Sequence, residues 1–256
     1  FARSILTTDK RTKEIAVSFA LEGSKVTVAG VAKGSGMIHP NMATMLAFIT
    51  SDISIDEKIL KDALSHSVNN SFNQISVDGD QSTNDTVLIM TNGKANNKKI
   101  TNIDVAEKFI KALDEVCIFL AKEIAKDGEG NTRLIEATVQ GAKTEDDARK
   151  ATKYIVSSNL VKTAVYGRDP NWGRIMMAVG ASQIELDESK IEIFVNDIQI
   201  VAEGIATPYN HQSVVIAMNQ PTIRLTVNLN IGKSIAKAWG SELTEEYVVF
   251  NSAYTT

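Results

Sequence analysis

Residues 33–50 read KGSGMIHPNMATMLAFIT, a glycine-containing segment followed by an apolar one. Its first half contains two glycines followed by Pro40 and Asn41, a composition typical of a loop. From Thr44 the residues turn apolar, and 44–51 (TMLAFITS) predict a short buried strand. A loop that leads into a buried strand is therefore the plain structural interpretation of the segment.

The flanking segments predict both strands and helices. Upstream, 14–21 (EIAVSFAL) and 25–32 (KVTVAGVA) predict a hairpin around Glu22-Gly23-Ser24. Downstream, Asp56 is a good N-cap for a helix that runs to about Phe72. The stretch 86–91 (TVLIMT) predicts a second buried strand.

The second half continues this mixture. Helical spacing predicts the longest helix from Asp104, with Val105 on its apolar face, to a stop at Asp127-Gly128. A second helix is predicted over 144–157 with Thr144 as N-cap, and a short one over 243–250. Strands are predicted over 134–140, 191–195, 199–202, 214–217 and 223–229. Hairpins combined with β–α–β stretches favour an α+β fold, a layered sandwich of mixed sheets and helices.

Composition excludes several classes of protein. The net charge of −4 over 256 residues argues against nucleic acid or an anionic membrane as the main partner. No stretch is apolar enough to span a bilayer, and the first residues are not a signal peptide. The single cysteine, Cys117, excludes a disulfide framework and fits a reducing compartment, so we expect the cytoplasm. Because no initiator Met is present, we expect a fragment or a processed product.

Most residue types that could carry chemistry have a plain structural interpretation. The glycines after Lys33 lack Walker spacing, and Asp78-Gly79-Asp80 lacks EF-hand spacing. Cys117 lies on an apolar helix face and His66 on a polar one, which predicts a core residue and a solvated residue. His211 is predicted in a loop between strands. The residues Trp172 and Trp239 are expected in packing roles.

One chemical hypothesis competes at Thr44. A threonine at the start of a buried strand would be a fixed nucleophile if the preceding bond were cut. Its freed amine, with a reference pKa of about 7.7–8.0, could then act as its base.

Residues 33–46 (KGSGMIHPNMATML) resemble the self-cleaving segment of the ornithine acetyltransferase family, the glutamate N-acetyltransferases of arginine biosynthesis. The resemblance recurs in four further blocks from one end of the chain to the other: SVDGDQSTNDT (76–86), DGEGNT (127–132), DPNWGRI (169–175) and WGSELTEEYVVFNSAYTT (239–256).

The resemblance implies a precursor that cuts itself between Ala43 and Thr44. Residues 1–43 then correspond to the C-terminal part of an α chain, and 44–256 to a β chain that begins with the nucleophile. The main α body, which in the family carries the Thr-Gly pair of the oxyanion hole, is absent here. Asn131 stands where alanine is usual, and His39 occupies a variable position; neither change removes a group that the mechanism needs.

Family roles transfer to five positions. Thr44 resembles the catalytic nucleophile and also contacts the substrate. Lys33, Glu129, Asn251 and Thr256 resemble substrate-binding residues, with Lys33 and Glu129 as anchors of opposite charge for an amino-acid substrate. The resemblance implies an α2β2 heterotetramer, no metal and no bound cofactor, with acetyl-CoA as a further acetyl donor in bifunctional members.

The expected activity is acetyl transfer from N-acetylornithine to glutamate through an acetyl-Thr44 intermediate. Two alternatives stay open. One is a self-processing N-terminal-nucleophile amidohydrolase or aminopeptidase, in which water takes the place of glutamate. The other is an inert fragment without its α partner.

Overall fold

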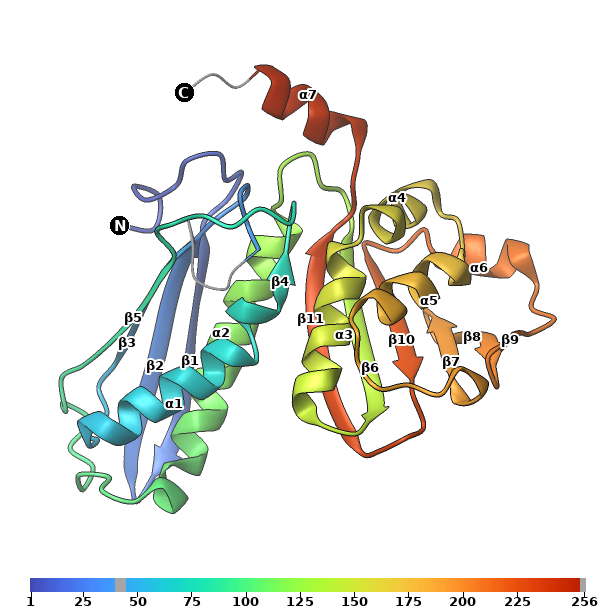
Figure 1. The fold of residues 1–256 in the computed structure, drawn as a ribbon. Helices are drawn as coiled ribbons and strands as arrows, with labels where there is room; N and C mark the ends of the chain where they lie inside the picture. The colour runs from blue at the N-terminus through green and yellow to red at the C-terminus, as the bar shows by residue number, and fades with distance from the viewer. Residues whose placement is uncertain (40–44, 254–256) are drawn as a thin grey trace. The chain divides into compact units, whose positions relative to one another are not determined.

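The computed structural model describes residues 1–39 and 45–253. The chain divides into two compact units, shown in Figure 1. Unit 1 comprises Phe1–Asn73 and Asp80–Asp127, and unit 2 comprises Gln74–Gly79 and Gly128–Thr256. The described residues contain no helix with the length and apolar character to cross a membrane.

Unit 1 is built on a four-stranded sheet in the order β1-β2-β3-β5, with β1 over Lys13–Leu21, β2 over Ser24–Lys33, β3 over Leu46–Ser51 and β5 over Thr86–Thr91. The first three strands are antiparallel neighbours, and β5 runs parallel to β3. The predicted hairpin is confirmed. Its turn residues Glu22 and Gly23 both have positive φ, 47° and 86°, as a two-residue turn of type I′ requires.

The two helices of unit 1 lie on one face of this sheet (Figure 1). Helix α2 (Glu107–Lys126) packs on β1 and β2, and α1 (Glu57–Asn69) packs on α2. Gly30 allows the close approach, because a Cβ there would lie 2.7 Å from Val116. Cys117 is fully buried in this core, as predicted. The other face of the sheet is open, so the predicted burial of β5 is wrong: Leu88 and Met90 are 46% and 55% exposed.

Helix boundaries in unit 1 follow their capping residues. Asp56 caps α1 as predicted, accepting a 3.0 Å hydrogen bond from the Lys58 N–H, but the helix ends at Asn69. Helix α2 begins at Glu107 rather than at Asp104. Asn102 captures the Asp104 N–H and opens a 3₁₀ turn, η2 (Ile103–Ala106), so Val105 points outward.

Unit 2 is built on a seven-stranded mixed sheet. Its central pair, β6 (Leu134–Ala142) and β10 (Thr222–Asn228), is parallel, and the other pairs are antiparallel except β4–β11. The full order is β4 (Ile75–Ser76), β11 (Ser234–Ser241), β6, β10, β7 (Glu192–Val195), β8 (Ile198–Ala202), β9 (Ile205–Ala206). Helix α3 (Glu145–Ser157) packs on β6 and β11, and Thr144 caps it as predicted. The core between them is aliphatic.

The sequence pattern did not predict the helices α4 (Asn159–Gly167) and α5 (Trp172–Ala181), the strand β11, or the two-residue strands β4 and β9. A short 3₁₀ turn, η3, covers Glu188–Lys190. The strand predicted over 214–217 is wrong. These residues belong to α6 (His211–Ala217), whose N-cap Asn210 accepts from the Ser213 N–H, so His211 opens a helix. The last helix, α7, covers Glu245–Ala253. The α+β class with mixed sheets is confirmed.

Candidate active site

The predicted site residues fall into three groups. Ala43, Thr44 and Thr256 lie outside the described residues. Lys33 belongs to unit 1, whereas Glu129 and Asn251 belong to unit 2.

Lys33 is the last residue of β2 and is 8% exposed. It stands opposite Leu46, the first residue of β3. Because β2 and β3 are antiparallel neighbours, the segment between them connects two backbone ends held side by side. The Ala43–Thr44 bond belongs to this connection, one residue before Met45.

A buried ion network lies at the first end of the connection. The Lys13 ammonium lies 2.6 Å from Asp9 Oδ1 and 2.6 Å from Asp127 Oδ2, with side-chain exposures of 0%, 0% and 4%. Three charges buried together need mutual pairing, because an unpaired one would carry a large desolvation penalty. The alternating pattern of β1 did not reveal this role of Lys13.

The same network holds the residues that follow Lys33. The Gly34 N–H donates to Asp9 Oδ1 at 2.7 Å, and the Ser35 hydroxyl donates to the Asp127 carbonyl at 2.7 Å. Burial raises the pKa of Asp9, but the Gly34 amide and the hydrogen bond and charge of Lys13 outweigh it, so that this pKa lies below its ordinary value of 3.8. The carboxylate thus stays ionised and keeps Gly34 in place.

In unit 2, Glu129 lies in a tight turn directly after α2. The Asn131 N–H closes the turn on the Gly128 carbonyl at 2.9 Å. Both flanking glycines are required: a Cβ on Gly128 would lie 2.2 Å from Ser241 Oγ, and one on Gly130, whose φ is +69°, would lie 2.5 Å from the Tyr247 nitrogen. The Gly128-Glu129-Gly130 spacing alone favours a C-cap turn with a solvated glutamate. Glu129 is only 8% exposed, so that interpretation is wrong.

Asn251 is the partner of this carboxylate. Its Nδ2 donates to Glu129 Oε2 at 3.0 Å and to the Tyr247 carbonyl at 3.0 Å. Two residues 122 positions apart, selected as substrate-binding residues by the resemblance, are thereby brought together. With both N–H groups of the amide directed to these acceptors, the Asn251 oxygen is the atom that can accept from a ligand.

Thr244 fixes α7 to the Glu129 turn. Its hydroxyl donates to the Gly130 carbonyl at 2.9 Å and accepts from the Tyr247 N–H at 3.2 Å. Asn131, the departure from the family pattern, adds a second connection, because its Oδ1 accepts from the Glu242 N–H at 3.1 Å. The Glu242 carboxylate in turn pairs with Arg133 at 3.0 Å. The asparagine therefore strengthens the frame of the turn.

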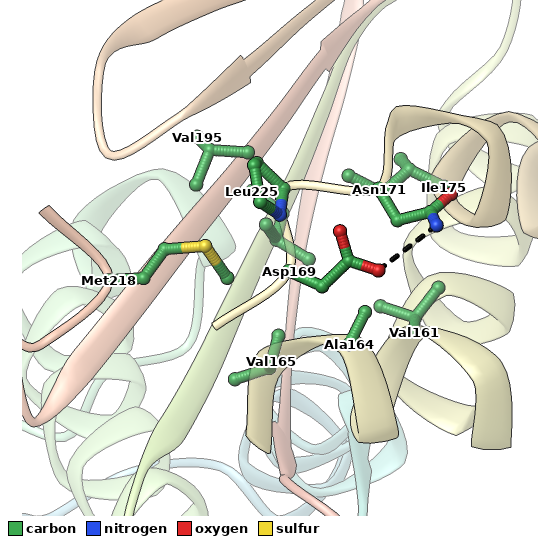
Figure 2. Close-up of a pocket in the computed structure, with 10 residues that line it drawn as sticks. Val161, Ala164, Val165, Asp169, Asn171, Ile175, Val195, Met218 and Leu225 are labelled. Carbon is green, nitrogen blue, oxygen red and sulfur yellow. Dashed lines mark hydrogen bonds between the residues drawn. The ribbon is translucent and has the colours of Figure 1, made fainter. Parts of the chain in front are cut away.

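A small hollow of about 230 Å³ in unit 2 contains none of the predicted site residues (Figure 2). Its only carboxylate is Asp169, which accepts from Asn171 Nδ2 at 3.1 Å. Asn171 also caps α5 by accepting from the Arg174 N–H, and Arg174 Nη1 donates to the Leu160 carbonyl. The block 169–175 thus comprises the end of the turn that joins α4 to α5 and the first residues of α5. Apart from Asp169 and Asn171, the residues that line the hollow are apolar: Val161, Ala164, Val165, Pro170, Ile175, Val195, Met218 and Leu225.

Comparison with known proteins identifies the family to which this chain belongs. The sequence profile of the ArgJ family matches residues 1–256, so the chain belongs to the ArgJ family. It is 46% identical to the arginine biosynthesis bifunctional protein ArgJ of Bacillus cereus and 48% identical to that of Geobacillus kaustophilus. The whole chain is covered in both matches, and it spans 63% of the length of each relative.

A solved structure agrees with the fold. The arginine biosynthesis bifunctional protein argJ of Bacillus halodurans matches with a TM-score of 0.80 and 44% sequence identity. The match covers 82% of this chain and 100% of that chain.

Proposed function

We propose that this chain is part of a self-cleaving ornithine acetyltransferase, which transfers acetyl from N-acetylornithine to glutamate in arginine biosynthesis. The observation that carries the proposal is the buried Glu129 carboxylate held by Asn251. N-acetylornithine has a free side-chain ammonium and a carboxylate. Glu129 is suited to the first, and Lys33 to the second.

The proposed reaction has two half-reactions. The Thr44 hydroxyl oxygen attacks the acetyl carbonyl carbon while the Thr44 amine takes the hydroxyl proton. The tetrahedral intermediate collapses, the C–N bond breaks, and the departing nitrogen takes that proton to leave as ornithine. The neutral amine of glutamate then attacks the acetyl-Thr44 ester, and the Thr44 amine takes a proton from the attacking nitrogen. The ester C–O bond breaks, that proton restores the Thr44 hydroxyl, and N-acetylglutamate leaves. A covalent intermediate divides one difficult step into two easier ones.

The nucleophile is proposed to form by self-cleavage. The Thr44 hydroxyl attacks the Ala43 carbonyl, the peptide C–N bond breaks, and an ester joins the two residues. Water hydrolyses that ester, leaving a carboxylate on Ala43 and a free amine on Thr44. The Bacillus halodurans match supports this division: its whole chain is covered by 82% of this one, close to the share that residues 44–256 make up.

The proposed partner is the rest of the precursor. It would supply the oxyanion hole that the resemblance implies, and α2β2 is the assembly we propose. Support comes from the difference in length from the relatives and from the open face of the unit 1 sheet. A hollow of about 760 Å³ on that face is lined by Phe1, Ala29, Gly30, Val31, Phe48, Thr50 and Met90. Exposed apolar surface of this kind marks an interface. We propose the cytoplasm as the compartment, which the single free Cys117 supports.

Acetyl-CoA is proposed as a second acetyl donor to the same threonine, and no cofactor or metal is proposed to stay bound. The word "bifunctional" in the names of the relatives supports a second reaction. Formation of N-acetylglutamate from acetyl-CoA and glutamate alone, followed by mass spectrometry, tests this part separately.

The main experiment incubates the complete precursor with N-acetylornithine, with and without glutamate. We expect ornithine release that depends on glutamate and yields N-acetylglutamate. Equal release in water alone would instead identify a hydrolase, and no release would identify an inert protein. The T44A variant should remain uncut and inactive. N-terminal sequencing of the wild type should give a chain that starts Thr44-Met45-Leu46; the same start in T44A would contradict self-cleavage.

A further inference from the structure

The residue that follows Thr44 is fixed at both of its backbone polar groups. Met45 is 1% exposed. Its carbonyl accepts from the Thr86 N–H at 2.9 Å, and its own N–H donates to Asp85 Oδ1. Both partners are the last residues of the block 76–86, to which the proposed reaction gives no role.

The bond to Asp85 replaces a regular sheet contact. In the parallel pairing of β3 with β5, Leu46 stands opposite Thr86. One residue further back, a regular ladder would direct the Met45 N–H to the carbonyl of Asn84. That carbonyl instead accepts from the Thr86 hydroxyl at 3.2 Å, and the Asp85 carboxylate takes the Met45 N–H. The ladder therefore ends on a side-chain carboxylate oxygen in place of a backbone carbonyl.

We propose that Asp85 is a positioning residue for the reaction at Thr44, an inference that rests on the proposed function. Only two backbone carbons separate the Met45 nitrogen from the Thr44 nitrogen. The peptide plane that carries the Met45 N–H also contains the Cα atom of residue 44. A carboxylate that holds this plane therefore restricts where the hydroxyl and the amine of Thr44 can move. Asp85 acts through Met45 and is not assigned a contact with substrate.

Such positioning matters in both proposed steps. Attack on the Ala43 carbonyl and attack on the acetyl group each require the hydroxyl oxygen in a near-attack geometry. A displacement of about 1 Å costs on the order of 100-fold in rate. Asp85 is thus expected to affect turnover and cleavage more than substrate binding.

Two substitutions of Asp85 in the complete precursor test the proposal. Asp85→Ala removes the acceptor, and Asp85→Asn keeps an oxygen that can accept from Met45 while removing the charge. We expect Asp85→Ala to slow self-cleavage, followed by intact mass, by about 10- to 100-fold. Its kcat per cut subunit should fall by a similar factor with little change in KM, whereas Asp85→Asn should stay within about threefold of wild type for both.

A matched control lies at the other end of β3. Asp52 Oδ1 accepts from the Thr27 N–H at 2.8 Å, so it makes the same type of carboxylate-to-strand bond. Asp52→Ala should lower the melting temperature about as much as Asp85→Ala and leave cleavage and kcat unchanged. Normal cleavage and kcat in Asp85→Ala would overturn the inference, as would equal losses in both alanine variants. If T44A is itself cut or active, the proposed function fails, and that outcome is distinct from a failure at Asp85 alone.

Discussion

Glu129 depends on its neighbours for its buried position. Two glycines let the turn approach Ser241 and the start of α7, and the Asn251 amide then takes one carboxylate oxygen. A carboxylate held this way meets a ligand ammonium without first being ordered, which reduces the entropy lost on binding.

The charge of Glu129 can be tested with a shape-preserving change. Glu129→Gln should weaken binding of N-acetylornithine by about 1–3 kcal/mol, the range for a charge-assisted hydrogen bond, or roughly 5- to 150-fold in KM. Initial rates against N-acetylornithine concentration give this number. The control is Glu246→Gln, which removes an exposed carboxylate from α7 and should leave KM unchanged. An unaltered KM in Glu129→Gln would exclude the residue from the pocket.

Lys162 is a second residue whose buried environment has a measurable consequence, a change in the pKa of its side chain. It lies in α4, is 1% exposed, and donates from Nζ to the Val77 carbonyl. Burial lowers the pKa of its ammonium to about 8, against the opposing charge of Asp78. The lysine ties residue 77 to the helices of unit 2.

The lowered pKa of Lys162 determines whether the free energy of unfolding rises or falls with pH. Between pH 8 and about 10.4, the ordinary pKa of lysine, the unfolded chain holds a proton that the folded chain has lost, so the free energy of unfolding rises with pH. Relative to Lys162→Met, wild type should gain about 2 kcal/mol between pH 8 and pH 10. Urea unfolding of both proteins at the two pH values measures this gain in the free energy of unfolding. Lys150→Met, which removes an exposed lysine, should follow wild type; a constant difference between wild type and Lys162→Met would contradict the shift.

At the scale of elements, the proposed cut falls between two strands that remain paired. The β2–β3 ladder runs from Val28 opposite Ser51 to Lys33 opposite Leu46. Residues 1–43 would keep β1 and β2, and residues 44–256 would keep β3. Cleavage therefore removes one covalent bond and leaves the sheet intact.

We expect the two products to stay together after cleavage. Gel filtration under native conditions should give one peak that contains both chains, at the volume of uncut T44A. Denaturant should separate the chains, because the ladder is then lost. Late elution of the shorter chain, apart from the longer one, under native conditions would mean that the pairing does not hold them.

Local signals predicted some elements well. The hairpin at Glu22-Gly23 and the caps at Asp56 and Thr144 depend on neighbouring residues alone, and all three are confirmed. The stretch 214–217 failed because its β-branched residues favour a strand, whereas Asn210 caps a helix that buries Val214. The strand predicted over 86–91 is confirmed as β5, but its predicted burial is wrong, because burial depends on what covers a face of the sheet, which a strand's own sequence does not state.

The site was predictable only through resemblance. Spacing alone favoured a solvated Glu129, and nothing local links it to Asn251. The Lys13 network joins positions 9, 13 and 127, and a lysine at the start of a strand is ordinarily taken as polar and exposed. Asp85 replaces a backbone carbonyl, a substitution visible only once the β3–β5 register is known.

At the scale of the whole molecule, the open face of the unit 1 sheet is the feature that most needs a partner. The Phe1 ring packs edge-on against Phe48 with centroids 5.1 Å apart, yet Phe1 remains 71% exposed. Leu88 and Met90 project from β5 on the same unit. The relatives have additional length that this chain lacks, and we propose that it covers this face.

A charge on the open face should disrupt that assembly. Met90→Lys should prevent the rest of the precursor, supplied as a separate chain, from co-purifying, because burying an unpaired ammonium is strongly unfavourable. Met177→Lys alters another exposed methionine, 44% exposed and in unit 2, and should have no effect. Undiminished co-purification with Met90→Lys would place the interface elsewhere.

The Lys13 network also bears on timing. It closes only when residues near the start of the chain meet residue 127, and contacts so distant in sequence form late, since a large loop must be closed first. Until then the Ser35 hydroxyl lacks its acceptor, the Asp127 carbonyl, and Asp9, the acceptor of the Gly34 N–H, is held only by residues near it in the sequence. In the proposed reaction, a nascent or misfolded chain therefore keeps its Ala43–Thr44 bond. Cleavage would then follow folding, so a cut chain identifies a molecule that has folded completely.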